Sequence, residues 1–153
     1  MLRRLGHKAK FGKQMNSSNC IFCKIVAGEI PAAVVYDDSQ VLAFLDTGPI
    51  HPGHTLLIPK AHADALHTCP PESLQALSQI LGRLAAAVVK ATQCDGYNCL
   101  CNNGRVAGQS VDHVHFHIIP RFAGDGFMQK WPAQSYAEGQ MGRMAAEIKK
   151  KLE

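Results

Sequence analysis

The chain has 153 residues, of which 46% are hydrophobic and 18% charged, as is typical of a globular protein with one core of its own. Residues 1–19 contain five basic residues and no acidic one, so residues 20–153 contain 11 basic and 12 acidic residues. The basic excess therefore belongs to the N-terminal segment, and nothing predicts a nucleic-acid groove in the folded part. No apolar stretch is long enough to predict a transmembrane helix, so we expect neither nucleic acid nor membrane as a partner.

The basic segment 1–19 is predicted to be a disordered, solvated tail. An alternative is a mitochondrial transit peptide, because such peptides are basic, contain serine and lack acidic residues. No secretory signal precedes the six cysteines, so we expect a reducing compartment and no disulfide framework. The expected location is the cytoplasm, or the mitochondrion if the tail is a transit peptide.

Short apolar runs separated by turn residues predict three strands in the first part of the chain, at residues 33–37, 41–45 and 55–59. Pro70-Pro71-Glu72 is a helix-start signal, and apolar residues then recur at spacings of three and four over residues 72–91. This pattern predicts a long amphipathic helix.

Two further strands are predicted at residues 97–102 and 112–119, and helical spacing returns over residues 141–152, which end in a lysine cluster. The fold class expected is α+β: an antiparallel sheet of about five strands with a long helix packed on it, and helices on one side of the sheet. We expect a domain at residues 20–130 and a C-terminal extension with a helix at residues 131–153.

The run His113-Val-His-Phe-His117 places three histidines at a spacing of two. In a strand, this spacing puts all three imidazoles on one face, while Val114, Phe116 and Ile118 point into a core. Imidazole is a nucleophile, a general base and a metal ligand near neutral pH. The run therefore predicts a chemical site, the alternative being a strand with one solvated histidine face.

The cysteines divide into two kinds. Cys20 and Cys23 form a CxxC pair in a predicted turn at the start of the domain, and in a reducing cell such a pair binds metal or is redox-active. Cys99 and Cys101 flank an apolar residue in a predicted strand and are expected to be packed thiols. The histidines outside these motifs are expected on the surface: His7, His51 and His67.

Several stretches together resemble the histidine-triad (HIT) family. They are Cys20-Ile-Phe-Cys-Lys-Ile, Gly28-Glu-Ile-Pro, Leu42-Ala-Phe-Leu-Asp46, Pro52-Gly-His-Thr-Leu-Leu-Ile-Pro-Lys-Ala-His62, Asn102-Asn-Gly, Gly108-Gln-Ser and His113-x-His-x-His-x-x-Pro-Arg121. The resemblance covers residues 20 to about 127. The cysteine pair is similar to the zinc-containing, Hint-like branch, while Pro120-Arg121 and Ala123-Gly124-Asp125 also resemble the Fhit-like branch.

The resemblance implies a nucleotide site. His115 matches the family's nucleophile, which attacks the α-phosphate and forms a nucleotidyl-histidine intermediate. The other matched positions are phosphate contacts (His117, Asn102), donors to the phosphate and leaving group (Gln109, Ser110), a histidine of the pocket (His54), a ribose-binding acid (Asp46) and an apolar wall for the base (Ile21, Phe22, Ile25, Phe44). Core packing is the alternative for the wall, and a plain polar loop for Gln109 and Ser110.

The resemblance also implies a structural zinc ion, held by two thiolates and two imidazoles: Cys20, Cys23, His62 and His113. A closed Cys2His2 set would be structural, not catalytic. The alternative is that His113 makes a hydrogen bond, His62 lies on the surface and both cysteines are free thiols.

The expected function is hydrolysis or nucleotidyl transfer on a purine nucleotide conjugate such as an adenosine phosphoramidate, by a homodimer. Two alternatives keep the same fold: a dinucleoside polyphosphate hydrolase, and a nucleotide-binding regulatory protein with little turnover. A third is a module that binds RNA or membrane through the basic tail.

Overall fold

The structure, a computed structural model, describes residues 19–128 and 132–152. The predicted tail, apart from Asn19, lies outside these residues, and so does any transit peptide. Contacts divide the chain into two compact units after Ala123, whereas the sequence places the end of the domain near residue 130. In the described part of the chain, no helix is both long and apolar enough to cross a membrane.

The first unit is built on one antiparallel sheet, as predicted. Its strands are β1 (Val34–Asp37), β2 (Val41–Leu45), β3 (Thr55–Pro59), β4 (Gly96–Leu100) and β5 (Phe116–Arg121). They lie in the order β1-β2-β3-β5-β4, so that β4 and β1 form the edges of the sheet. Hairpin neighbours β1, β2 and β3 pair in sequence, and β5 is inserted between β3 and β4.

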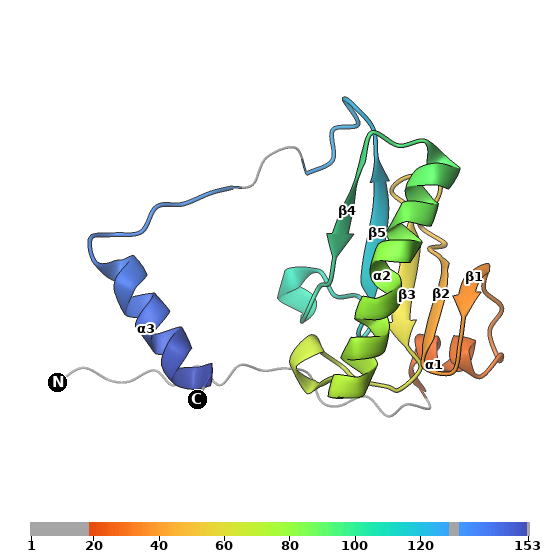
Figure 1. The fold of residues 1–153 in the computed structure, drawn as a ribbon, viewed down its shortest axis with the longest axis horizontal. Coiled ribbons are helices and arrows are strands. Elements are labelled where there is room, and N and C mark those ends of the chain that lie inside the picture. Colours follow the sequence, from red (N-terminus) through yellow and green to blue (C-terminus); the bar gives the residue numbers. More distant parts are fainter. Residues whose placement is uncertain (1–18, 129–131, 153) are drawn as a thin grey trace. The chain divides into compact units, whose positions relative to one another are not determined.

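The long predicted helix is α2 (Pro71–Thr92), which lies across one face of the sheet (Figure 1). Pro71 stands at its first turn, where a missing N–H costs no hydrogen bond. Its apolar stripe packs on alternate residues of the strands, and the main core contains Val41, Ala43, Leu57, Leu77, Ile80, Leu84, Val88, Val114 and Ile118. Period-two alternation in the strands and helical spacing in α2 thus meet in one core.

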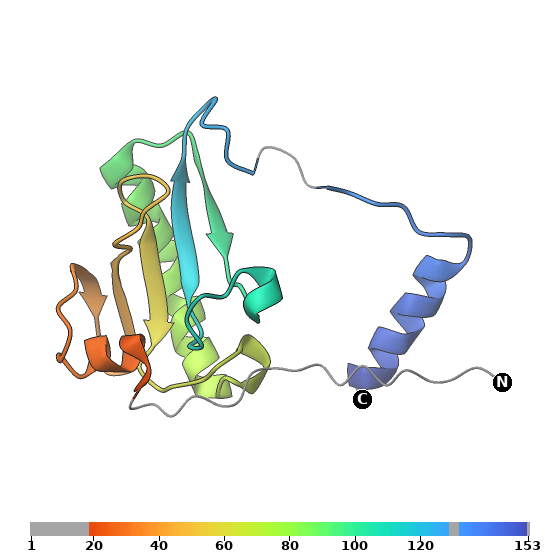
Figure 2. The ribbon, with the colours of Figure 1, turned by 180° about the vertical axis from the view of Figure 1, so that it is seen from behind.

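A short helix that the sequence did not predict, α1 (Ile21–Val26), lies on the opposite face of the sheet, seen from behind in Figure 2. It packs on the other set of alternate strand residues, in a second core of Cys20, Phe22, Leu42, Phe44, Leu56 and Ile58. The expectation that helices cover one side of the sheet is therefore wrong. The cause is Phe22, which is only 6% exposed and draws this segment onto the sheet.

The triad segment only partly belongs to a strand. Strand β5 begins at Phe116, because the backbone N–H of Val114 donates to the carbonyl of Ala63 in a loop and not to a neighbouring strand. The predicted alternation holds all the same. Val114 and Ile118 are buried in the core under α2, whereas the rings of His113 and His115 contact Phe22 on the opposite face.

Two other expectations have mixed outcomes. Cys101 is half-buried and packs against the main core, but Cys99 is exposed, because it lies on the edge strand β4. The predicted C-terminal helix is present as α3 (Gln140–Leu152), in the second unit.

Candidate functional site

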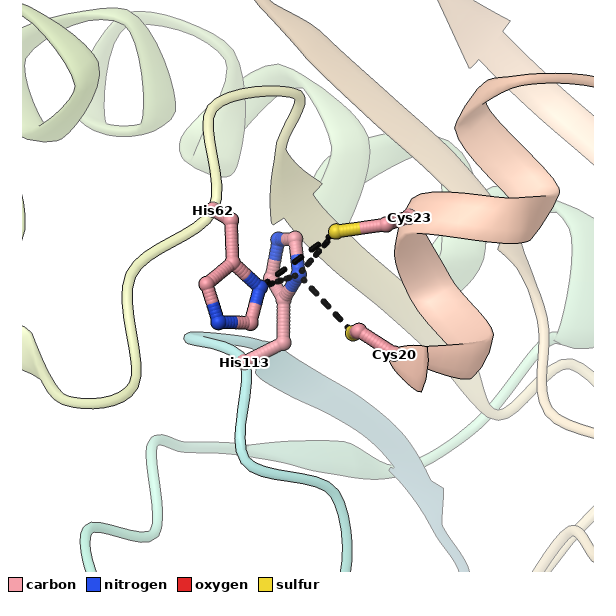
Figure 3. Close-up of side chains that lie close together, drawn as sticks. All are labelled: Cys20, Cys23, His62 and His113. Carbon is pink, nitrogen blue, oxygen red and sulfur yellow. Dashed lines mark hydrogen bonds between the residues drawn. The ribbon is translucent and has the colours of Figure 1, made fainter. Parts of the chain in front are cut away.

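Four side chains from three segments meet in one cluster, which we call the metal cluster: Cys20, Cys23, His62 and His113. Figure 3 shows that the cysteines come from the start of α1, His62 from the loop after β3, and His113 from the segment that leads into β5. Cys20 and His113 are each 0% exposed. The structure thus brings together all four residues that the sequence assigned to zinc.

The distances in the metal cluster suit a tetrahedral metal. The Nδ1 atom of His113 lies 3.4 Å from the Sγ atom of Cys20 and 3.3 Å from the Nδ1 atom of His62, which is 3.3 Å from the Sγ atom of Cys23. A tetrahedral zinc ion with bonds of about 2.3 Å to sulfur and about 2.0–2.1 Å to nitrogen separates its ligand atoms by about 3.3–3.8 Å. The cluster could therefore hold a divalent metal with little rearrangement.

The hydrogen bonds outside the metal cluster fix both histidine tautomers. The Nε2 atom of His113 donates to the carbonyl oxygen of Pro59 at 2.8 Å, and that of His62 donates to the carboxylate of Asp64 at 2.9 Å. Because each neutral ring carries one proton, both Nδ1 atoms keep their lone pairs, and these face the two thiols. Such outer partners are typical of metal-bound histidines. Asp64 is a residue that the sequence analysis did not find.

Burial shapes the acid–base chemistry of the metal cluster. Burial lowers the pKa of His113 to about 4, and burial together with the Cys20 thiol raises the pKa of Cys23 to about 11. Without a metal, neutral imidazole is therefore favoured at His113 and protonated thiol at Cys23. A bound divalent cation favours the thiolates instead.

The second cluster contains His115, His117, His54 and Asp46, and we call it the triad cluster. The Nδ1 atom of His115 donates to the carbonyl oxygen of His113 at 2.6 Å. Its Nε2 atom therefore carries the lone pair. His115 is 2% exposed, and burial lowers its pKa, so the neutral ring is favoured near pH 7.

His54 and His117 form a hydrogen-bonded pair next to His115. The Nδ1 atom of His54 accepts the backbone N–H of Ile50, and its Nε2 atom lies 2.9 Å from the Nδ1 atom of His117. The proton between them therefore belongs to His54, and His117 carries its own proton on Nε2, as a donor. Burial lowers the pKa of both rings, that of His117 to about 4.

Asp46 lies at the rim of the triad cluster, at the end of β2. Its Oδ1 atom accepts the backbone N–H of Gly48 at 2.8 Å, and its Oδ2 atom lies 3.7 Å from the Nε2 atom of His54. One carboxylate oxygen thus holds the local turn, and the other faces the histidines. The carboxylate can serve a ligand and its own loop at once.

The predicted phosphate-side residues differ in exposure. Ser110 is exposed and Asn102 is half-buried, with its amide 3.5 Å from the carbonyl oxygen of Gly108. Gln109 is 4% exposed. Its Oε1 atom accepts the N–H of Gly104, and its Nε2 atom donates to the carbonyl of Asp64. Much of its hydrogen-bonding capacity is therefore used within the protein.

The residues of the predicted base wall also differ in exposure. Phe22 and Phe44 are buried and stack edge to face, with ring centroids 5.5 Å apart. Ile21 is 46% exposed, and Ile25 is partly buried. Core packing therefore accounts for both aromatic rings, and the two isoleucines on α1 are the members of the wall that a ligand can reach.

Comparison with known proteins decides the family. The HIT domain family model matches residues 27–124. The chain belongs to the HIT family. An uncharacterised HIT-like protein of Methanocaldococcus jannaschii is 54% identical over 113 residues, 73% of this chain and 86% of that protein. The adenosine 5′-monophosphoramidase of Saccharomyces cerevisiae is 45% identical over 135 residues, 88% of this chain and 83% of that protein.

Solved structures of HIT proteins share the fold. A HIT family protein of Bacillus subtilis is 42% identical with a TM-score of 0.83, over 88% of this chain and 98% of that one. A histidine-triad protein of Mycobacterium smegmatis is 34% identical with a TM-score of 0.67, over 90% of this chain and 100% of that one, and its structure is described as zinc-bound. The metal and triad clusters are thus features of a HIT protein.

The lowered pKa of His117 predicts that this HIT protein is less stable in acid. The unfolded chain takes up the His117 proton near pH 6.5, whereas the folded chain takes it up near pH 4. The contribution of neutral His117 to the free energy of unfolding is therefore complete above pH 6.5 and is lost as the pH falls towards 4. Urea unfolding at a series of pH values should show this decrease, and His117→Gln should make it shallower.

His67→Gln is the matched control, because His67 is exposed and lies outside both clusters. It should keep the wild-type dependence on pH. An equally steep decrease in the His117→Gln variant and in the wild type would contradict the prediction.

Proposed function

We propose that this HIT protein is a nucleotide hydrolase that acts at the α-phosphate of a purine nucleotide conjugate, with an adenosine phosphoramidate as the preferred class of substrate. The single observation that carries the proposal is His115, a buried neutral imidazole whose Nε2 lone pair is left available by the bond from Nδ1 to the His113 carbonyl. The name of one relative supports the substrate class, since the Saccharomyces cerevisiae protein is an adenosine 5′-monophosphoramidase.

The proposed reaction has two steps. In the first, the Nε2 atom of His115 forms a bond to phosphorus, the phosphorus–nitrogen bond of the substrate breaks, and the leaving amine takes up a proton. In the second, water forms a bond to phosphorus and releases a proton to solvent, which balances the proton taken up in the first step, the bond to His115 breaks and restores its Nε2 lone pair, and the nucleoside monophosphate leaves. A covalent step through imidazole avoids direct attack by water, which is a weak nucleophile.

The other residues hold the substrate. The N–H on the Nε2 atom of His117 and the side chains of Ser110 and Asn102 donate to the phosphate oxygens, where negative charge develops. His54 keeps the donor of His117 in place. The free carboxylate oxygen of Asp46 accepts a ribose hydroxyl, and Ile21 and Ile25 contact the base.

Turnover of adenosine 5′-phosphoramidate, compared with diadenosine tetraphosphate, tests the function. Faster hydrolysis of the phosphoramidate is expected, and slower hydrolysis would favour a dinucleoside polyphosphate hydrolase. Binding of AMP with turnover of neither would favour a regulatory role. In the same assay, equal use of ribose and 2′,3′-dideoxyribose substrates would contradict the role of Asp46.

His115→Ala should abolish turnover and leave AMP binding largely intact, because the remaining residues still hold phosphate and ribose. Loss of a nucleophile costs about 10⁴- to 10⁶-fold in rate. The exposed residue His67, changed to alanine, is the control with wild-type rates. A His115→Ala variant that kept more than a tenth of wild-type turnover would mean that His115 is not the nucleophile.

We also propose that the metal cluster binds a structural zinc ion. Four protein ligands leave no open position for substrate, so the metal would join α1 to the segment that carries the triad. The donor set, the two Nδ1 lone pairs and the zinc-bound relative support this proposal.

Metal analysis should find one zinc ion per chain, and Cys20→Ser should lower both the zinc content and the melting temperature, since a structural site contributes folding energy. Cys99→Ser, at an exposed thiol outside the metal cluster, should change neither. Purified protein without zinc, with a melting temperature that a chelator leaves unchanged, would rule the proposal out.

A homodimer is the assembly we propose, from the family resemblance and from the edges of the sheet. Strands β1 and β4 each pair on one side only within the described residues, and both expose apolar side chains, among them Val34, Val35 and Tyr97. Unprotected edges of this kind favour pairing with another chain. Light scattering should give twice the chain mass of 16.6 kDa, and a monomer at micromolar concentration would contradict the assembly.

A further inference from the structure

Two loops that are far apart in the sequence are joined beside the metal cluster. The loop after β3 carries the ligand His62, and the loop after β4 carries Asn102 and Ser110. Three hydrogen bonds join the first loop to the second loop and its continuation: Gln109 Nε2 to the Asp64 carbonyl at 2.7 Å, the Leu66 N–H to Asn103 Oδ1 at 2.6 Å, and the Val114 N–H to the Ala63 carbonyl at 2.7 Å. A shift of one loop therefore moves the other.

Asp64 stands at the centre of this connection, because it has two partners. Its carboxylate accepts the Nε2–H of His62, which directs the Nδ1 lone pair of that ligand into the metal cluster. Its backbone carbonyl accepts from Gln109, whose own Oε1 atom is held by the Gly104 N–H at 2.6 Å. One residue thus contacts a metal ligand with its side chain and the phosphate-side loop with its backbone.

The burial of Gln109 makes the connection stiff. The side chain is 4% exposed. Breaking either of its two hydrogen bonds would therefore leave a buried polar group unpaired, which is costly. A polar side chain that only served a ligand would have its amide directed at the open part of the site. Here both ends of the amide are bonded to backbone groups.

We propose that Asp64 and Gln109 form a latch that couples the metal cluster to the phosphate-side loop. Asp64 is a positioning residue for the ligand His62, and Gln109 holds the backbone of Asp64 to the loop that carries Asn102 and Ser110. The part that concerns nucleotide rests on the proposed nucleotide activity, whereas the part that concerns metal rests on the proposed zinc site and not on that activity.

The latch links the binding of zinc thermodynamically to the binding of nucleotide. If zinc holds the loop after β3 in place, it also favours the arrangement of the phosphate-side loop that binds nucleotide. Linkage is reciprocal, so AMP must raise the affinity for zinc by the same factor by which zinc raises the affinity for AMP. Couplings between two sites are typically about 5- to 150-fold.

The first test measures zinc affinity of the full chain by competition with a chelator, without nucleotide. Asp64→Ala should weaken zinc binding about 10- to 100-fold, the usual effect of losing such an outer partner. Asp64→Asn keeps an oxygen that accepts from His62 and should recover part of the loss. Asp37→Asn is the matched control, because Asp37 pairs with Lys60, two residues before His62, and should leave zinc affinity unchanged.

Wild-type zinc affinity in Asp64→Ala would overturn the role of Asp64, and so would an Asp64→Asn variant as weak as the alanine variant. If Asp64→Ala does not fold, as judged by circular dichroism, the rate at which zinc-loaded Asp64→Asn releases zinc to the chelator decides. Release faster than from the wild type supports the role, and an equal rate overturns it.

The second test repeats the zinc titration with saturating AMP. The wild type should bind zinc at least several-fold more tightly with AMP present, and in Gln109→Ala this factor should fall towards one, although the His62–Asp64 bond remains. A wild-type factor of one, or an undiminished factor in Gln109→Ala, would overturn the coupling. Absence of AMP binding by zinc-loaded wild type would instead contradict the proposed function and, with it, the coupling, while the role of Asp64 would stand on the first test.

Discussion

The hydrogen bond from the Nε2 atom of His113 to the carbonyl of Pro59 is the interaction on which the rest of the site depends. The fully buried neutral ring of His113 donates its only N–H to Pro59, the last residue of β3. The lone pair on its Nδ1 atom therefore faces the two thiols and His62. The backbone carbonyl of His113 accepts the Nδ1–H of His115 and so sets the tautomer of the proposed nucleophile. Pro59 thus orients the ring of His113, and the backbone of His113 in turn orients the ring of His115.

The sheet and its long helix could be predicted from the sequence because their patterns are strong and local. Strands β2 and β3 have the predicted bounds, and α2 differs by one residue at each end. The face of the sheet on which the triad histidines lie was also predictable. Side chains alternate between the two faces from His113 onwards, although strand β5 begins only at Phe116. Helix α1 was not predictable: it has six residues and no side-chain cap, and the burial of Phe22, which holds it on the sheet, depends on strands farther along the chain.

The residues of the site that the sequence missed or assigned differently depend on contacts between distant loops. Asp64 stands two residues after His62, a spacing that offers a carboxylate to a metal-bound histidine, but only the folded loop shows that the two side chains meet. Gln109 belongs to a motif that indicates a phosphate donor, yet both ends of its amide are bonded to the backbone. Phe22 and Phe44 match the base wall of the family but pack against each other in the second core. The sequence alone cannot separate these two roles, because both require an apolar side chain at the same position.

Burying several imidazoles next to one another constrains their chemistry. In the described part of the chain, every buried side-chain nitrogen or oxygen has a hydrogen-bond partner, and burial lowers the pKa of His54, His113, His115 and His117. Since each neutral ring has one proton to give and one lone pair to offer, the carbonyl and amide groups around them leave a single arrangement of protons. An added proton on His54 or His117 would disrupt a hydrogen bond that its ring accepts, and an added proton on any of the four rings would place a charge in a poorly solvated position. His115, the proposed nucleophile, is therefore held as a neutral imidazole before any substrate arrives, and no proton has to be removed from its Nε2 atom.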